Sequence, residues 1–506
     1  MKRLKILTAA LLAAVVTTSM SSITCSAAAT IQEPTYPSNT KQTTITWWSW
    51  TSSADKIVAD FEKAYPNIKV EHPTIGAGSN EYSKLQTVLK AGTGAPDVVQ
   101  IEYQYLPQFI EMNGLQDISQ YVNQYKSSFQ DWTWAQCSRG SKVYAVPEDV
   151  GPLMFIYRTS VFQKNGISAP KTYDELEAAA KTLHDKDPQT YMTFFPYNDP
   201  GQIVGFLWQA GSQLFTYQNN TWYVNINNST SKKVMNYWSN MIKKGYVKAT
   251  SDGTPTWQSE IANGKYASVI GASWYPTYSL TPYVKPSTND WKASDTPQWD
   301  SSSFVNGNWG GSTNAVTTQS KNVEAASLFA AWINSSNAGV NRGITDRGLF
   351  PADKYGTQLD AFNKPNASLS NQQVGSIFTK AASAVNTSFQ WSPWTDYVYK
   401  QMTTEFTNAS AGKETFDQAL DNIQANVVSF AKTSGYTVQE GAPTAAATST
   451  ASGAVSGTAS AAASTATASS TSGGVNMGAV IAVIVILVVV VLAVLLKRRS
   501  LKGKSK

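Results

Sequence analysis

Hydrophobic and polar positions along the middle of the chain follow two different periods. Short apolar runs such as TTITWW and PDVVQIE have the pattern of buried strands, and between them apolar residues recur as on one face of a helix. Pro66 and Gly92 follow two of the helical stretches and are expected to end them. The predicted strands are 43–48, 68–73 and 96–102, and the predicted helices between them are 53–66 and 80–92.

The same alternation continues towards the C-terminus. Thr172 is followed three positions later by Glu175, the spacing of a capping box, which predicts a helix over 172–188. Two more amphipathic helices are predicted at 232–247 and 322–335. Strands that alternate with helices are typical of parallel sheets covered by helices, so an α/β fold is expected.

The N-terminal residues carry a targeting pattern. Lys2, Arg3 and Lys5 precede an apolar run, and small residues follow it near Ala28. This order predicts a secretory signal peptide over residues 1–29. Lipidation of Cys25 is the alternative, but the preceding SSIT lacks the small and aliphatic residues of a lipobox at the required positions.

Three segments follow the body at the C-terminal end. Residues 441–474 consist mainly of Ala, Ser, Thr and Gly, a composition that predicts a flexible stalk. Residues 477–496 carry no charge and are long enough to cross a bilayer as one helix. The basic tail 497–506 is expected in the cytoplasm by the positive-inside rule, which places the body outside a cell membrane that the chain crosses once.

The formal charge of +6 originates at the two ends of the chain. Nine of the 40 Lys and Arg lie in 1–29 and 497–506, which leaves 31 to balance 34 Asp and Glu. The body has no basic excess, so no nucleic-acid partner is expected. His72 and His184 are isolated and no phosphate loop occurs, so neither a metal nor a cofactor is expected. Cys137 alone remains after signal cleavage and is expected in the core.

Several blocks of the body sequence occur in a specific order. The first is ITWWSWTSSADKIVADFEKAYPNIKVE, the second contains GAPDV, and the most diagnostic is the stretch that begins SKVYAVPEDVGPLMFIYR. In this order they resemble the extracellular solute-binding proteins of ABC sugar importers, the family that includes maltose-binding protein. The blocks are 45–71, 85–102, 114–122, 141–183, 260–274, 306–333 and 412–427.

The resemblance implies a two-lobed α/β fold of the type II periplasmic-binding-protein class for the body, residues 43–438, with a hinge and a ligand cleft between the lobes. Ligands in such folds lie outside the carboxyl ends of the strands, where Trp50 follows the first strand. The chain is expected to cross between lobes near 146–147, 304–307 and 334–337. Lobe one is then about 43–146 with 306–334, and lobe two about 148–304 with 338–438.

A sugar presents flat faces of C–H groups, which aromatic rings suit. The chain has 16 Trp, and several fall in regions that line the cleft in the family that the chain resembles. Trp238 and Trp332 lie instead on apolar helix faces and are expected in the core. The aromatic candidates for ligand binding are Trp48, Trp50, Tyr103, Trp274, Tyr275, Trp309, Trp391 and Trp394.

Sugar hydroxyls suit carboxylate and amide partners, and candidates of this kind follow the predicted strands and crossings. Gly310 is added because its backbone can approach a ligand closely. Asp346 and Arg347 are adjacent in sequence and are expected to form an ion pair with each other. The polar candidates are Glu102, Glu148, Asp149, Asn198, Asp199 and Asn308.

The function that the resemblance implies is that of a membrane-anchored, extracellular binding protein. It captures a sugar, more narrowly an oligosaccharide, and as a monomer delivers it to an ABC permease in the same membrane. The first alternative is a surface glycan sensor or adhesin with the same fold, although a ten-residue tail is short for signalling. The second is an anchored glycoside hydrolase. Glu148 and Asp149 are adjacent and form no readable catalytic pair, so no enzyme activity is expected.

Overall fold

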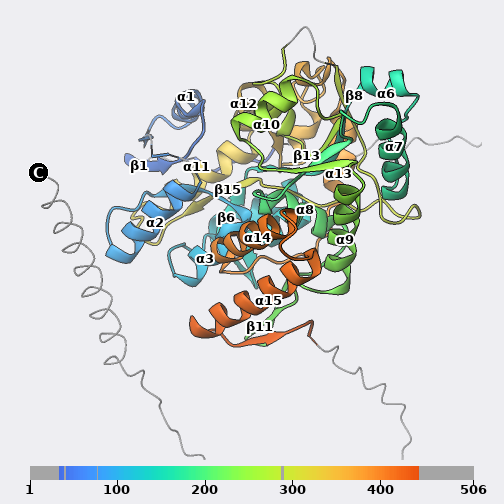
Figure 1. Cartoon of the computed structure of the whole chain (residues 1–506). Helices are drawn as coiled ribbons and strands as arrows, with labels where there is room; N and C mark the ends of the chain where they lie inside the picture. The colour runs from blue at the N-terminus through green and yellow to red at the C-terminus, as the bar shows by residue number, and fades with distance from the viewer. Residues whose placement is uncertain (1–32, 39–40, 74, 77, 286–289, 444–506) are drawn as a thin grey trace, which may run out of the picture. The chain divides into compact units, whose positions relative to one another are not determined.

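The computed structural model describes residues 33–38, 41–73, 75–76, 78–285 and 290–443 (Figure 1). The expected signal peptide (1–29), membrane span (477–496) and basic tail (497–506) lie outside these residues, as does most of the expected stalk. In the part of the chain that is described, no helix combines the length and the apolarity that a membrane crossing requires.

Five strands form the first sheet, in the order β2-β1-β3-β15-β6. β1 (Thr43–Trp48) pairs in parallel with β2 (Ile68–Glu71) and β3 (Val98–Glu102). β15 (Ser312–Val316) lies antiparallel between β3 and β6 (Ala145–Pro147). In this sheet the expected parallel pairing holds for β1, β2 and β3 but not for β15, which enters from the end at which β1 and β3 finish.

Helices cover the first sheet with their apolar faces. α1 (Ala54–Ala64) buries Phe61, and α11 (Val323–Ser335) is buried along its whole length from Ala325 onwards. Trp47 of β1 packs against Phe329 of α11 with ring centroids 5.2 Å apart, and Phe329 packs on Phe61 at 4.9 Å. Trp332 is buried in the same core, as predicted. These rings fix the helices against the sheet.

A second group of strands lies further along the chain. β8 is central in an antiparallel sheet, and a parallel pair of strands packs beside it. Sheet order is β13 (Ser268–Ala272), β8 (Leu153–Arg158), β14 (Trp291–Ser294), and the parallel pair is β9 (Thr193–Pro196) with β12 (Val247–Thr250).

Both helices predicted in this second group are present; α7 begins where the sequence predicts, whereas α9 begins at Ser229 rather than at 232. α7 (Tyr173–Lys186) is capped by Thr172, whose hydroxyl oxygen accepts a hydrogen bond from the Glu175 N–H at 3.1 Å. Trp238 of α9 (Ser229–Lys243) is fully buried, as predicted. Both helices therefore bury their apolar faces in this second group.

Short strands connect the two groups. Between β6 and β8, β7 (Asp149–Val150) pairs antiparallel with β16 (Phe350–Pro351), and Asn308 forms a bridge with Pro152 on the path back to β15. These pairings lie at the crossings expected near 146–147 and 304–307. We call β7 and β16 the hinge pair.

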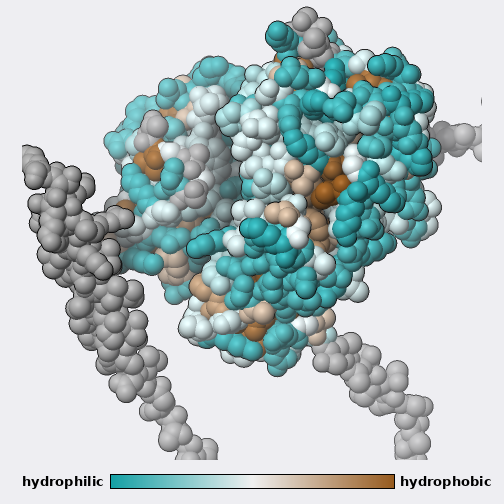
Figure 2. Space-filling view, in the orientation of Figure 1, coloured by the Kyte–Doolittle hydropathy of each residue, from teal (hydrophilic) through white to brown (hydrophobic). Residues whose placement is uncertain are grey.

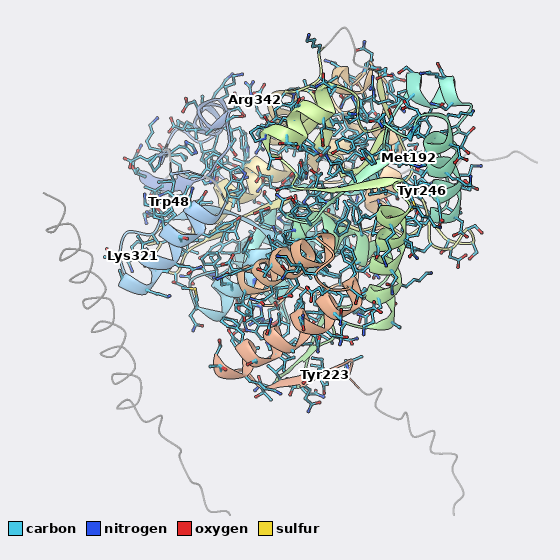
Figure 3. The ribbon with its side chains drawn as sticks, viewed as in Figure 1. Trp48, Met192, Tyr223, Tyr246, Lys321 and Arg342 are labelled. Atoms are coloured by element: carbon cyan, nitrogen blue, oxygen red, sulfur yellow. The ribbon has the colours of Figure 1, made fainter. Side chains whose placement is uncertain are left out.

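The segment after α11 departs from the expected lobe boundary. α12 (Asn337–Arg347) is joined to α1 by an ion pair between Arg342, labelled in Figure 3, and Asp60 at 2.7 Å. Lys56 of α1 and Asp346 form a second ion pair at 3.5 Å. These ion pairs join α12 to α1 of the first group, whereas the sequence-based boundary assigns 338–347 to lobe two. The chain leaves the first group only at the hinge pair.

The surface visible in Figure 2 is mainly hydrophilic. The other elements complete the two groups of strands and helices. α2 (Ser79–Ala91) ends at Gly92, whose φ of 75° closes the helix as predicted. The remaining elements are α3 (Leu106–Glu111), α4 (Ser119–Val122), α5 (Asp131–Gln136), β4 (Ser138–Arg139), β5 (Lys142–Val143), α6 (Thr159–Asn165), α8 (Pro200–Gln209), β10 (Phe215–Gln218), β11 (Thr221–Val224), α10 (Pro255–Ala262), α13 (Gly375–Ser383), α14 (Thr395–Ser410), α15 (Phe416–Thr433) and β17 (Val438–Glu440).

One carboxyl group of α2 is buried without a hydrogen-bond partner among the described residues. Glu81 is fully buried, and neither of its carboxyl oxygens has a partner. Burial raises the pKa of Glu81 from 4.5 to about 8, although Lys84 opposes the rise. Because the folded-state pKa lies above the unfolded value, Glu81 lowers the free energy of unfolding progressively as the pH rises between these two values.

Replacing Glu81 by Gln should remove this pH-dependent loss. We expect Glu81→Gln to raise the free energy of unfolding at pH 8 by an amount on the order of 2 kcal/mol. At pH 4.5 the variant should not be more stable than the wild type, because Glu81 is protonated there in the folded protein. Urea unfolding followed by tryptophan emission across this pH range measures the difference.

Glu62→Gln is the matched control, on α1. Partial burial raises the pKa of Glu62, but hydrogen bonds from the Val70 N–H and Lys69 lower it. The resulting pKa lies below the ordinary value. Loss of the Glu62 carboxylate should slightly lower the free energy of unfolding above pH 5. This change is opposite in sign to that expected for Glu81→Gln. If Glu81→Gln gave the same change in stability at every pH, the unpartnered buried carboxyl would not be the cause.

Candidate functional site

A cavity of about 380 Å³ lies where β1 and β3 end. Its lining comes from both groups of strands: the turn after β1, the end of β3, the hinge pair, and the segments that follow β13 and precede β15. Figure 2 shows the surface hollowed between the region of α1 and α2 and the region of α10. The lining residues are Trp50, Thr51, Ser52, Gly78, Gln100, Glu102, Asp149, Trp274, Tyr278, Gly310, Gly311, Ser312, Arg347 and Leu349.

Two indole rings line this cavity from opposite groups of strands. Trp50 follows β1 and meets Tyr82 of α2 edge-on, with ring centroids 6.3 Å apart. Trp274 follows β13 and packs on Trp309 at 4.7 Å, and its Nε1–H donates a hydrogen bond to the Trp309 carbonyl oxygen at 3.1 Å. Both rings are half-buried, so packing and hydrogen bonding hold them while part of each stays accessible.

The turn before β15 needs glycine at two positions. Gly310 and Gly311 have φ of +74° and +89°. A Cβ on Gly311 would lie 2.7 Å from the Asp149 carbonyl oxygen, so a side chain there would clash with the backbone of the hinge pair. The missing side chains let this turn lie directly against the hinge beside the cavity.

Below the cavity lies the buried carboxylate of Glu148. Its Oε1 accepts a hydrogen bond from Nη1 of Arg347 at 2.5 Å, and its Oε2 accepts one from Nε2 of Gln100 at 2.7 Å. Nδ2 of Asn314 in β15 is 3.4 Å from the same Oε2. The expected ion pair between Asp346 and Arg347 is therefore wrong: Arg347 pairs with Glu148, because adjacent side chains on a helix face different directions.

Gln100 connects this carboxylate to the turn that carries Trp50. Its Oε1 accepts hydrogen bonds from the Ser49 hydroxyl at 2.6 Å and from the Trp50 N–H at 3.2 Å. Nη1 of Arg347 also donates to the Thr51 hydroxyl oxygen at 3.1 Å. Glu148 therefore determines, through these two partners, where the turn after β1 lies.

Burial raises the pKa of three carboxyl groups at or near the cavity. For Asp149 the neighbouring Glu148 charge adds to the effect of burial, while Arg347 opposes it. Burial also raises the pKa of Glu102, against hydrogen bonds from Gln104 and Tyr82. It raises the pKa of Asp199 to about 6. Of the three, Glu102 and Asp149 line the cavity, where carboxyl oxygens can accept hydrogen bonds from a polar, uncharged ligand.

Five of the residues predicted from the sequence line the cavity: Trp50, Glu102, Asp149, Trp274 and Gly310. Trp48 is buried at the end of β1, where the Lys84 ammonium lies 4.7 Å from its ring centroid; Figure 3 labels this tryptophan. Tyr103 is buried beneath Gly311. A binding role for Trp48 and Tyr103 stays a prediction, since their geometry is that of support.

Three more predicted residues lie directly behind the lining. Tyr275 and Trp309 are buried, with ring centroids 5.4 Å apart, behind Trp274. Asn308 accepts a hydrogen bond from the Gly151 N–H at 2.8 Å and donates one to the Gly310 carbonyl oxygen at 2.7 Å. Asn308 therefore joins the hinge to the turn before β15.

Asn198 and Asp199 lie in the loop between β9 and α8 and do not line the cavity. Asn198 donates to the Asp252 carbonyl oxygen at 3.1 Å and accepts from the Asp252 N–H at 2.6 Å. Asp199 caps α8 by accepting a hydrogen bond from the Gln202 N–H at 3.0 Å. Their observed contacts connect loops of the second group.

Trp391 and Trp394 lie elsewhere. Trp391 packs on Phe389 with ring centroids 4.9 Å apart and lines a separate cavity of about 330 Å³ with Trp222. Trp394 packs against Trp222 at 5.4 Å. The structure thus does not bring these two residues to the cavity at β1 and β3.

Sequence reasoning missed Gln100 and Tyr278, and it assigned Arg347 to an ion pair with Asp346 rather than to the site. Gln100 had a usable signal, because it is a polar residue inside the apolar strand β3. Tyr278 is exposed beside the cavity, and its hydroxyl donates to the Arg347 carbonyl oxygen at 2.8 Å. Within the described ranges, no cluster of three or more His, Cys, Asp or Glu side chains is arranged to hold a metal ion.

Residues 47–340, more than half of the chain, match the sequence profile of the bacterial extracellular solute-binding protein family. The matched range includes Trp50, Glu102, Asp149 and Trp274 of the cavity. The chain belongs to this family. It has the family's two-lobed α/β fold, with the cavity between the lobes and the hinge pair beside it.

Known proteins of this family resemble the chain over most of the body. An arabinooligosaccharide-binding protein of Bacillus subtilis (strain 168) is 24% identical over 310 residues, which cover 59% of this chain and 70% of the relative. A second arabinooligosaccharide-binding protein, from Halalkalibacterium halodurans, is 22% identical over 273 residues, 50% of this chain and 58% of the relative.

Solved structures agree with the fold. The ABC-transporter-associated binding protein from B. animalis subsp. lactis Bl-04, in complex with beta-1,6-galactobiose, has a TM-score of 0.68 and 26% identity, covering 78% of this chain and 99% of that protein. The galacto-N-biose-/lacto-N-biose I-binding protein from Bifidobacterium longum has a TM-score of 0.69 and 24% identity, covering 78% and 98%. Both are named as binding proteins of ABC transporters.

Breaking the Glu148–Arg347 ion pair should destabilise the body. We expect Arg347→Met to lower the free energy of unfolding by about 3 kcal/mol, because it leaves a buried carboxylate without its cation. A second substitution, Glu148→Gln, should recover part of the loss. Urea unfolding of the single and double variants measures both effects.

Arg139→Met is the matched control. Arg139 pairs with Glu111 at 2.7 Å, but both side chains are about one-third exposed, so this loss should stay below about 1 kcal/mol. Equal losses for the two arginine variants would contradict the importance of burial for the Glu148–Arg347 pair.

Proposed function

We propose that this chain captures a carbohydrate, more narrowly an oligosaccharide, in the cavity at the ends of β1 and β3 and delivers it to an ABC permease. The observation that carries the proposal is that two indole rings, Trp50 and Trp274, and two carboxyl groups, Glu102 and Asp149, line one cavity. Aromatic rings suit the C–H faces of a sugar, and carboxyl groups form strong hydrogen bonds with its hydroxyls.

The size and the mouth of the cavity favour a ligand of more than one sugar unit. Its volume of about 380 Å³ falls in the range of small-molecule sites, roughly 300–1,000 Å³. Tyr278 lines the same cavity and is 48% exposed, so it offers a third ring near the surface. A second sugar unit can contact this ring while the first lies between the tryptophans.

The similar proteins support a saccharide but differ in which one they bind. Two relatives are named for arabinooligosaccharides, and a structure that is 26% identical to this chain holds beta-1,6-galactobiose. The common element is a short, uncharged saccharide. We therefore propose the same class of ligand for this chain and name no individual sugar.

Delivery and anchoring complete the proposal. Ligand contacts made by both lobes would favour a closed form, to the extent that they are stronger there than in the open form. A span at 477–496 and a stalk at 441–474 would keep the body near a permease in the same membrane. Lobe one would be 43–146 with 306–334, extended by α12, and lobe two the rest of 148–438.

The two alternatives differ in what they require of the same residues. A glycoside hydrolase needs two free carboxyl groups at the scissile bond. Glu148 is engaged by Arg347 and Gln100, and one Asp149 oxygen accepts a hydrogen bond from the Ser312 N–H at 2.8 Å. A sensor or adhesin would use the cavity as proposed but without a permease, which uptake assays distinguish.

The proposal is tested by titrating the purified full-length protein in detergent with a panel of mono- and oligosaccharides. Calorimetry should give a saturable signal with at least one uncharged oligosaccharide, and chromatography of the mixture should show no new product. Cleavage of a bound saccharide would assign an enzyme instead. Silence across arabinan, galactan and glucan oligosaccharides would remove the carbohydrate assignment.

Removing either indole from the cavity should weaken saccharide binding. We expect Trp50→Ala and Trp274→Ala each to raise Kd about tenfold or more, because each removes a face on which a sugar stacks. Trp299→Ala is the control. This residue is also half-buried, but it stacks on Tyr173 at 3.9 Å and does not line the cavity. An unchanged Kd for both cavity variants would contradict the site assignment.

A further inference from the structure

The charged groups around the cavity are not equally available to a ligand. Three charged side chains line it: Glu102, Asp149 and Arg347. Arg347 forms an ion pair with Glu148, which lies just outside the lining. Among the residues that the structure describes, neither Glu102 nor Asp149 is joined to a basic side chain by an ion pair. Within the described part of the chain, the one cation that lines the cavity is thus already paired, and the two acids are not.

Arg347 is held in place by buried contacts. Its side chain is 8% exposed and that of Glu148 is 4% exposed. Its Nη1 donates to Glu148 at 2.5 Å and to the Thr51 hydroxyl oxygen at 3.1 Å. A guanidinium is the usual partner of a ligand carboxylate because it can donate two parallel hydrogen bonds. Here Glu148 takes the place of the ligand carboxylate.

The two acids of the lining accept hydrogen bonds from uncharged groups. Glu102 accepts from the Tyr82 hydroxyl at 3.1 Å and from Nε2 of Gln104 at 2.9 Å. Asp149 accepts from the Ser312 N–H at 2.8 Å. Among the residues that the structure describes, Arg347 is the one basic side chain that lines the cavity, so no second cation in the lining offsets a negative charge on these two carboxyl groups.

We infer that Glu148 makes this cavity select uncharged saccharides over saccharides that carry a uronate carboxylate, because it neutralises Arg347 in place of the ligand. The inference rests on the proposed saccharide binding. A uronate brought into the cavity would lose hydration and meet Glu102 and Asp149 without a free cation. Hydroxyl groups can donate to the same carboxylates. Glu148 acts through Arg347 and is a positioning residue.

The test compares matched pairs of saccharides on the full-length protein at pH 8. Each uncharged saccharide that binds is titrated beside its own C6-carboxylate derivative, with α-1,4-galactobiose and α-1,4-digalacturonate, and cellobiose and cellobiouronate, included from the start. The wild type should bind the uncharged member at least tenfold more tightly. Glu148→Gln keeps the shape of the side chain and should reduce this ratio about tenfold, mainly by tighter binding of the uronate.

Two further variants separate charge from structure. Glu111→Gln makes the same chemical change beside Arg139, away from the cavity, and should leave the ratio unchanged. Glu148→Gln combined with Arg347→Gln should restore the preference for the uncharged saccharide, because the cation that attracts the uronate is gone. A merely structural role of Glu148 would lower both affinities together and leave the ratio as it was.

The outcomes are distinguishable. If the wild type binds a uronate and its uncharged counterpart with similar Kd, the inference is overturned while saccharide binding stands. A parallel loss of both affinities in Glu148→Gln overturns the inference as well. If that variant does not fold, the test is the ratio of the wild-type Kd values for the uronate and its uncharged counterpart. If no saccharide binds the wild type at all, the proposed function fails first, and this inference fails with it.

Discussion

The arrangement of the site depends on one constraint: the buried carboxylate of Glu148 must be paired. A charge without partners in the interior is unfavourable by several kcal/mol. Its partners are Arg347 at the end of α12 and Gln100 in β3, with Asn314 of β15 nearby. Its main chain is also engaged, since its N–H donates to the Ser312 carbonyl oxygen at 2.9 Å. Satisfying one carboxylate thus brings together β3, β15, the hinge pair and α12, which are the elements that surround the cavity.

The second constraint is steric and acts where the chain crosses between lobes. A Cβ on Gly151 would lie 2.0 Å from the Trp309 carbonyl oxygen, and one on Gly307 would lie 2.1 Å from the Gly205 carbonyl oxygen. No side chain fits at either position, so the crossing segments pack backbone to backbone. Close packing at the hinge gives Trp274 and Trp309 a fixed support.

Local pattern predicted the elements well because periodicity records which face of a helix or strand is buried. The helices at α1, α7 and α11 all appeared where the spacing of apolar residues placed them. Partners distant in sequence were not predictable in this way. Glu148 and Arg347 are 199 positions apart, and Asp346, next to Arg347, looked like the natural partner. The prediction that Trp391 lies at the cavity failed for a related reason. Trp391 occurs in a polar loop, but its ring packs inside among other aromatic side chains.

Membership of the family determines the scaffold more than the ligand. The matched residues end at 340, whereas Arg347 and Leu349 of the cavity lining lie beyond them. Trp50 and Trp274 lie in segments after strands, and such loops vary while the strands that carry them keep their pairing. The net charge of the cavity depends on whether Arg347, at the end of α12, is paired with a buried acid. In this chain Glu148 provides that acid, so the proposed selection of ligand depends on a contact beneath the cavity as well as on the residues that line it.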